Sequence, residues 1–186
     1  IITLADHSAS FRIEGGRKLS GTITTNTSKN AAVSLLCASL LNKGKTVLRS
    51  VPRIEEVNRI VEVLTSIGVS AKWVDNDLHI QPPKKLSLAA IDKEAAVKTR
   101  SVLMLLGPLS HLFKTFRLPL AGGCKLGERT VRPHLYALEN LGVKIKTHHD
   151  YYDVSSPKLK ASEIVLYESG DTVTENALMA AARING

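Results

Sequence analysis

The chain has 186 residues, of which 44% are hydrophobic and 23% charged, and this apolar content excludes a disordered or low-complexity protein while sufficing for one ordinary domain and part of another. Twelve glycines and two cysteines exclude collagen-like and disulfide-scaffold proteins, and no apolar run approaches the roughly 18 residues of a membrane-spanning helix. Twenty-five Lys and Arg against 17 Asp and Glu give a net charge of +8, which favours a phosphate-bearing partner, whereas 4% aromatic content disfavours base stacking and makes nucleic acid an unexpected partner.

Apolar helical segments recur along the chain. The first spans residues 31–41, the second 102–109 and the third 176–184, and the first two are apolar on nearly all sides, as buried helices are. Around these segments we expect each unit to run strand, buried helix, strand, amphipathic helix, and then one or two strands.

Two glycines mark the same place in successive units. Residues 61–70 and 135–144 both predict the end of a helix, a left-handed cap at Gly68 or Gly142, and then a strand. The two glycines are 74 residues apart, and the apolar helices recur with nearly the same spacing. The chain therefore contains about two and a half copies of a unit of about 75 residues.

The predicted strands alternate between apolar and polar residues, as Leu78 and Ile80 do with His79 and Gln81. Such strands have one dry and one wet face, whereas a doubly wound α/β protein has fully apolar strands and half-wet helices. We therefore expect an inside-out α/β barrel of repeated strand-helix units, with the helices buried and the sheets outside.

The start of the first apolar helix is a candidate anion site. Thr27 or Ser28 is suited to cap the helix, which places Lys29 and Asn30 in its first turn, where free backbone amides favour a negative charge. A capping serine followed by a surface lysine is the plainer interpretation of these residues alone.

A glycine-rich loop carries the second candidate site. Three glycines lie within residues 122–127 around Cys124, and Arg129 and Arg132 follow closely, so the cysteine lies in an electropositive setting that lowers a thiol pKa. This suits a proton donor or a nucleophile, and a turn with an incidental cysteine is the equally open alternative. Cys37, in the middle of an apolar helix, is expected to be a core residue.

Arg100 begins the second apolar helix, at the position that Lys29 and Asn30 hold in the first. Two basic residues at equivalent helix starts would converge where the N-termini of the buried helices meet, and such a point suits a diphosphate. An exposed arginine is the alternative, although the apolar surroundings disfavour it.

The combination of these motifs resembles the UDP-N-acetylglucosamine 1-carboxyvinyltransferases, the enolpyruvyl transferases of peptidoglycan synthesis. The likeness runs from about Phe11 to Gly186, and its most specific element is the Gly-Gly-Cys sequence at 122–124. The sister family, the 5-enolpyruvylshikimate-3-phosphate (EPSP) synthases, shares the fold but not that cysteine. The segments that carry the resemblance are residues 29–32, 106–109, 118–119, 122–127, 129 and 141–143.

The resemblance implies transfer of the enolpyruvyl group from phosphoenolpyruvate to the 3-hydroxyl of UDP-N-acetylglucosamine, with release of phosphate. Carried over by position, Cys124 is the proton donor, and Lys29, Asn30 and Arg129 bind phosphoenolpyruvate. The nucleotide sugar is bound by Arg100 and by the stretch Arg129, Thr130, Val131, Arg132 and Pro133. The two substrates are the expected partners, and neither a metal nor another cofactor is expected.

The resemblance also implies a six-unit protein with two globular domains, of which this chain is an N-terminal part. Residues 1–24 are then a strand segment that packs with the second domain, and residues 25–186 are a transferase-like domain that is inactive alone. A cytoplasmic location is expected, because two unpaired cysteines suit a reducing compartment and residues 1–8 lack a signal-peptide pattern.

The nucleotide side of the expected site departs from the family pattern. Thr27 and Ser28 replace Gly-Ala, Arg132 replaces an aspartate, Glu168 replaces a lysine, and residues 170–174 also differ. Exchanged charges at 132 and 168 would keep the pocket balanced, or they indicate another phosphorylated acceptor. A third alternative is a non-catalytic anion-binding paralogue.

Overall fold

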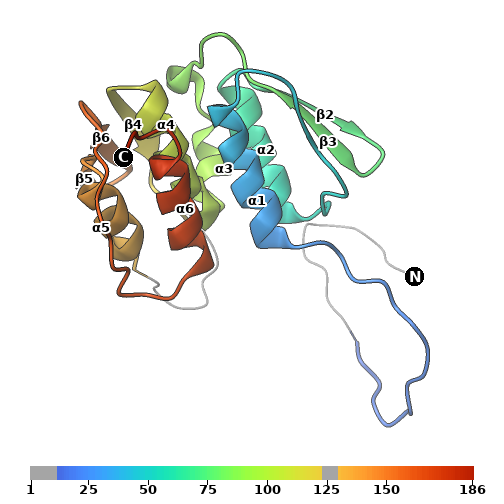
Figure 1. Ribbon diagram of the computed structural model, residues 1–186. Coiled ribbons are helices and arrows are strands. Elements are labelled where there is room, and N and C mark those ends of the chain that lie inside the picture. The colour runs from blue at the N-terminus through green and yellow to red at the C-terminus, as the bar shows by residue number, and fades with distance from the viewer. Residues whose placement is uncertain (1–11, 123–129) are drawn as a thin grey trace.

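The computed structural model describes residues 12–122 and 130–186, which form helices and two three-stranded sheets (Figure 1). The first repeat unit consists of α1 (Lys29–Ala38), η1 (Ser39–Leu41), β1 (Thr46–Leu48), α2 (Glu55–Ser66), β2 (Ser70–Val74) and β3 (Asp77–Gln81). After η2 (Leu88–Ala90) and α3 (Lys93–Val97), the second unit consists of η3 (Arg100–Leu105), α4 (Leu106–Leu112), β4 (Thr115–Pro119), α5 (Arg132–Asn140), β5 (Lys144–Thr147) and β6 (Tyr151–Ser155). The last helix is α6 (Asp171–Ala181).

Both sheets have the same topology. Their strand orders are β1-β3-β2 and β4-β6-β5, and every pairing is antiparallel. In β3, Leu78 and Ile80 are fully buried while His79 between them is less so, and in β6 Tyr152 and Val154 occupy the equivalent buried positions. Each sheet therefore has one face on the core, as the alternation predicted.

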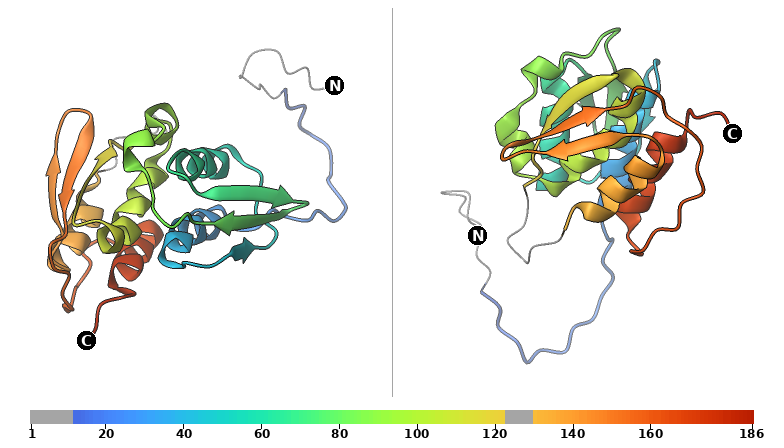
Figure 2. Two further views of the ribbon diagram at one scale, coloured as in Figure 1. Left: turned by 90° about the horizontal axis from the view of Figure 1, so that it is seen from above. Right: turned by 90° about the vertical axis from the view of Figure 1, so that its left-hand side faces the viewer.

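The helices lie between the two sheets (Figures 1 and 2). Helix α6 packs against both α1 and α4, α2 packs on α1, and α5 packs on α6. The predicted arrangement of helices inside and sheets outside is confirmed, and the two units repeat the order inner helix, strand, outer helix, two strands.

One expected element is missing from the described residues. Among residues 12–28, which are exposed and extend away from the helices (Figure 1), no strand leads into α1. Between β3 and η3 the chain forms η2 and α3 and no strand. Asp92 explains α3, because its side chain accepts the Ala95 amide and caps a helix. The pairing of residues 1–24 with a second domain stays a prediction.

The predicted helix ends agree with the structure. Gly68 and Gly142 have φ of 103° and 94°, the left-handed conformation that a glycine adopts without strain, and each directly follows the end of an outer helix. The inner helices are less enclosed than expected, since Leu35 on α1 is 52% exposed and Leu178 on α6 is 64% exposed.

Candidate functional site

A cleft of about 510 Å³ lies at the N-terminal ends of the inner helices. Figure 1 shows α1 and α6 beginning at the same end of the molecule, and the start of η3 contributes to the same cleft. The lining residues come from five segments and are Lys29, Asn30, Glu56, Arg100, Ser101, Met104, His134 and residues 168–173. The predicted convergence of Lys29 and Arg100 is therefore present.

Lys29 stands in the first turn of α1 and forms an ion pair. Ser28 is the N-cap, and its Oγ accepts the Ala31 amide at 3.3 Å. The Lys29 Nζ lies 2.5 Å from Glu56 Oε2 on the first turn of α2, and this contact fixes the ammonium over the helix start. A cation at a helix N-terminus is unfavourable by itself, so the carboxylate compensates for the helix dipole.

Glu56 collects three side-chain contacts in the cleft. Besides Lys29, the hydroxyl of Ser101 donates to Glu56 Oε1, and Thr99 Oγ1 lies 3.4 Å from the same oxygen. Burial raises the pKa of the Glu56 carboxyl, but the hydrogen bonds and the Lys29 charge outweigh burial and hold this pKa below its ordinary value. Glu56 is thus ionised and links the start of α1 to the start of η3.

Arg100 begins η3 with the support of a capping residue. Thr99 is the N-cap, and its Oγ1 accepts the Ser101 amide at 3.0 Å. The Arg100 Nη2 donates to the Thr130 carbonyl at 2.7 Å, which ties the guanidinium to the segment that enters α5. Two cations on separate inner helices therefore face one cleft, an arrangement suited to an anionic ligand.

The third inner helix brings carboxylates to the cleft. Asp171 is the first residue of α6, and its Oδ2 accepts from Asn30 Nδ2 at 3.4 Å. Glu168, three residues earlier, also lines the cleft. Among the described residues, three carboxylates (Glu56, Glu168 and Asp171) and two cations (Lys29 and Arg100) therefore line the cleft.

His134 is a buried member of the site that the sequence did not indicate. It lies in the first half of α5 with 3% of its surface exposed, and its Nδ1 is 3.3 Å from Asn176 Nδ2. Burial, together with the nearby Arg100 charge, lowers the pKa of His134 to about 4. The imidazole is therefore neutral at physiological pH.

The run from Thr130 to Pro133 lies beside the cleft. Thr130 accepts from Arg100, Val131 packs on the core, and Pro133 is buried at the start of α5. Arg132 forms an ion pair with Glu139 on its own helix at 2.9 Å, and this pair raises the pKa of its guanidinium. Within the described ranges, none of these four residues lines the cleft, and their substrate contacts stay predictions.

Cys124 and Arg129 lie outside the described residues, so their predicted roles stay predictions. Cys37 is fully buried in α1, as expected of a core residue, and burial raises the pKa of its thiol far above the ordinary value. Cys37 is therefore an unreactive thiol at neutral pH. Residues 12–122 and 130–186 contain no group of three or more His, Cys, Asp or Glu side chains placed to hold a metal ion.

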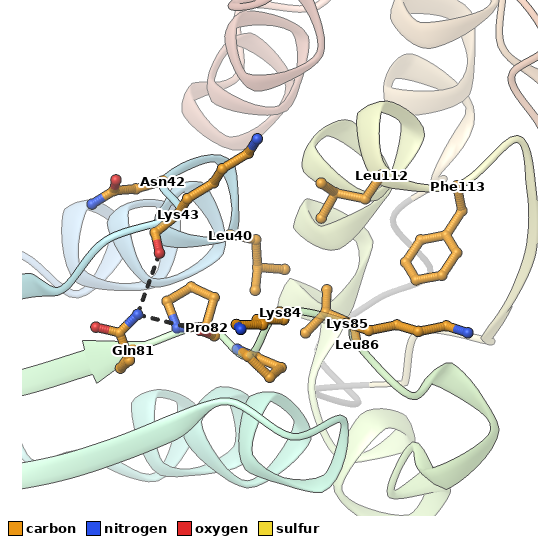
Figure 3. A pocket seen from close by; sticks show the side chains of 11 residues that line it. Leu40, Asn42, Lys43, Gln81, Pro82, Lys84, Lys85, Leu86, Leu112 and Phe113 are labelled. Carbon is orange, nitrogen blue, oxygen red and sulfur yellow. Dashed lines mark hydrogen bonds between the residues drawn. The ribbon is translucent and has the colours of Figure 1, made fainter.

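A second pocket, of about 720 Å³, lies at the opposite ends of the inner helices (Figure 3). Its lining includes Leu40 after α1, Leu112 at the end of α4 and the neighbouring Phe113, together with lysine side chains. Gln81 Nε2 donates to the Lys43 carbonyl at 3.3 Å and closes one side. None of the predicted site residues that the structure describes lines this pocket.

Repeated units with buried helices, outer sheets and cationic helix starts define an enolpyruvyl-transferase fold. The chain belongs to the EPSP synthase (3-phosphoshikimate 1-carboxyvinyltransferase) family, whose model matches residues 13–186.

The chain is 38% identical over 177 residues to the UDP-N-acetylglucosamine 1-carboxyvinyltransferase of Bradyrhizobium diazoefficiens, and the match covers 95% of this chain and 41% of that relative. It is 35% identical over 178 residues to the enzyme of the same name from Helicobacter pylori, covering 95% of this chain and 42% of the relative. The chain thus spans about two fifths of the length of the curated relatives it matches.

Solved structures show the same fold. The chain superposes on the enolpyruvyl transferase NikO from Streptomyces tendae with a TM-score of 0.75 and 17% identity, over 92% of this chain and 40% of that one. An EPSP synthase from Acinetobacter baumannii gives a TM-score of 0.64 with 16% identity, over 89% and 39% of the two chains.

Along the described residues, no helix has the length and hydrophobicity needed to cross a bilayer.

Proposed function

We propose that the protein containing this chain transfers the enolpyruvyl group from phosphoenolpyruvate to the 3-hydroxyl of UDP-N-acetylglucosamine, releasing phosphate, in the synthesis of peptidoglycan precursors. The observation that carries the proposal is the cleft in which Lys29 and Arg100 converge, within a chain 38% identical to an enzyme with this name. The sugar and the enol both carry phosphate, and two cations at helix starts suit such ligands.

In the proposed reaction, Lys29 and Asn30 bind phosphoenolpyruvate together with Arg129, and Cys124 protonates its methylene carbon. The hydroxyl oxygen then bonds to the adjacent carbon and loses its proton to a base supplied by another part of the protein. A methyl proton then returns to the Cys124 thiolate, and cleavage of the carbon–oxygen bond to phosphate restores the double bond. The cations stabilise the negative charge that collects on the departing phosphate.

Arg100 and the stretch 130–133 are the proposed contacts to the nucleotide sugar. The ordered link from Arg100 to the Thr130 carbonyl supports this assignment, because it holds that stretch next to the cleft. A cytoplasmic location and the packing of residues 1–24 with a second domain belong to the same proposal.

A related transferase with a different phosphorylated acceptor is the second candidate. Glu168 lines the cleft, whereas Arg132 forms an ion pair with Glu139. The exchanged charges at positions 132 and 168 are therefore not paired with each other in the described contacts. An acidic wall, where the family pattern described above has a lysine, favours an acceptor with a different head group.

The test is phosphate release from phosphoenolpyruvate by the full-length gene product, with UDP-N-acetylglucosamine or with shikimate 3-phosphate. We expect release with the nucleotide sugar and its loss in Cys124→Ala, while Cys37→Ala stays active as a matched cysteine control. Release only with shikimate 3-phosphate would support the second candidate. No release from folded protein with either acceptor contradicts the first proposal and supports a non-catalytic relative.

A further inference from the structure

The Asn176 side chain takes the place of one main-chain hydrogen bond in the second inner helix. Its Oδ1 accepts the Gly107 amide at 2.9 Å and its Nδ2 donates to the Leu103 carbonyl at 3.0 Å. Residues 103 and 107 are the pair that an uninterrupted α-helix would join directly, and they flank the junction of η3 with α4. Both ends of the amide are therefore fixed by backbone groups that cannot exchange roles.

This fixed amide determines the tautomer of His134. A backbone N–H only donates and a carbonyl only accepts, so Asn176 must present Nδ2 toward Leu103. The same Nδ2 lies 3.3 Å from His134 Nδ1, which must then be the unprotonated acceptor. In a neutral imidazole the remaining proton is on Nε2.

The protonated nitrogen of His134 is available to the cleft. The ring lines the cleft wall, and its Nδ1 side faces the fully buried Asn176. Among the described residues, Nε2 makes no hydrogen bond. Every fully enclosed side-chain nitrogen or oxygen in that part of the chain has a partner, so Nε2 is not fully enclosed. Nε2–H is thus a neutral donor, presented beside the cations of Arg100 and Lys29.

We propose that His134 is a specificity-determining residue whose Nε2–H donates to a phosphate oxygen of the acceptor, with Asn176 as its positioning residue. The inference rests on the proposed function. A phosphate oxygen is the fitting partner because Arg100 lines the same cleft and Nε2–H cannot accept a proton from a hydroxyl.

The first test is independent of turnover. A long-range proton–nitrogen NMR spectrum of the full-length protein, assigned by comparison with His134→Gln, distinguishes the two tautomers of His134. We expect Nδ1 without a proton and Nε2 with one, and a mixture of tautomers in Asn176→Ala. A protonated Nδ1 in the wild-type protein would overturn the proposal.

The second test measures steady-state kinetics of full-length variants with UDP-N-acetylglucosamine and phosphoenolpyruvate. His134→Phe should raise the KM for the acceptor by about 10- to 100-fold, because a donor to a charged oxygen is lost, while the KM for phosphoenolpyruvate changes much less. His134→Gln, which retains an N–H donor, should recover most of this loss. His111→Gln is the matched control, since His111 contacts the Ala180 carbonyl of α6 but does not line the cleft.

The two proposals fail in different ways. If wild-type protein releases no phosphate with the nucleotide sugar, the proposed function fails, and binding of inorganic diphosphate measured by calorimetry then tests His134 alone. Weaker diphosphate binding in His134→Phe, restored in His134→Gln, supports the inference. Equal binding or equal acceptor KM in wild type and His134→Phe contradicts it.

Discussion

The two repeat units place a cation at the start of the inner helix and hold it in different ways. In the first unit Lys29 is held by the Glu56 carboxylate, on the first turn of the following outer helix. In the second unit Arg100 is held by the Thr130 carbonyl, immediately before the equivalent outer helix. The backbone relation is the same, but one of these partners is an ionisable side chain and the other is a peptide group.

The difference separates two kinds of control over one anion site. The Lys29–Glu56 contact depends on pH and on salt, and an incoming anion competes with the carboxylate for the ammonium. The Arg100–Thr130 contact involves a group that does not titrate, and it adjusts only if the chain before α5 moves. The Lys29 contact is therefore sensitive to charge, whereas the Thr130 carbonyl fixes the direction of one Arg100 nitrogen.

The largest expected effect comes from deleting each cation in the full-length protein. Lys29→Ala should lower kcat/KM by about 100- to 1000-fold, because it removes a charge that stabilises the departing phosphate. Arg100→Ala should mainly raise the KM for the acceptor, by about 10- to 100-fold. Phosphate-release kinetics measure both, with Lys43→Ala, at the opposite pocket, as the control lysine. If the two variants changed the kinetic constants for both substrates equally, the two cations would not have different roles.

A smaller effect is expected from Glu56→Gln. Because the pKa of Glu56 is below its ordinary value of 4.5 in the folded protein, its contribution to stability is present above that pH and is lost as the pH falls through the folded pKa. The contribution is about 1 kcal/mol, since the ion pair is partly exposed. Urea unfolding at neutral and acidic pH should show a gap between wild type and variant that closes on acidification. A gap that persists in acid would contradict the assigned ionisation.

The smallest effect is expected from the two helix caps. Ser28→Ala removes the acceptor for the Ala31 amide and should cost about 0.5–1 kcal/mol of unfolding free energy. Thr99→Ala should cost somewhat more, because Thr99 also approaches Glu56 in addition to capping η3. Urea unfolding of the two variants gives the order of the two losses. A larger loss of unfolding free energy in Ser28→Ala than in Thr99→Ala would show that the Thr99–Glu56 contact does not stabilise the packing of the two units.

Much of the fold follows from local sequence signals. Gly68 and Gly142 mark helix ends because only glycine adopts their φ without strain, and the alternation through Leu78 and Ile80 marks a strand with one buried face. The cleft was predictable in part, since Lys29 and Arg100 begin helices of the same kind.

The remaining site residues were not predictable because their contacts join distant positions. Glu56 is 27 residues from Lys29 and 45 from Ser101, and Asn176 is 42 residues from His134. No local pattern distinguishes Glu56 from Glu55, its neighbour on α2. Which carboxylate faces Lys29 is decided by the rotation of α2 against α1, and this depends on the whole core.

The Asn176 amide in the helix ladder also has a consequence for the order of folding. The Gly107 amide has its acceptor on α6, 69 residues later, so this part of α4 is protected only after α6 has docked. A side chain on Gly107 would itself obstruct docking, because a Cβ there would lie 2.7 Å from Asn176 oxygens. The Gly107 amide is therefore a single-site reporter of assembly, and its hydrogen exchange should follow the undocking of α6.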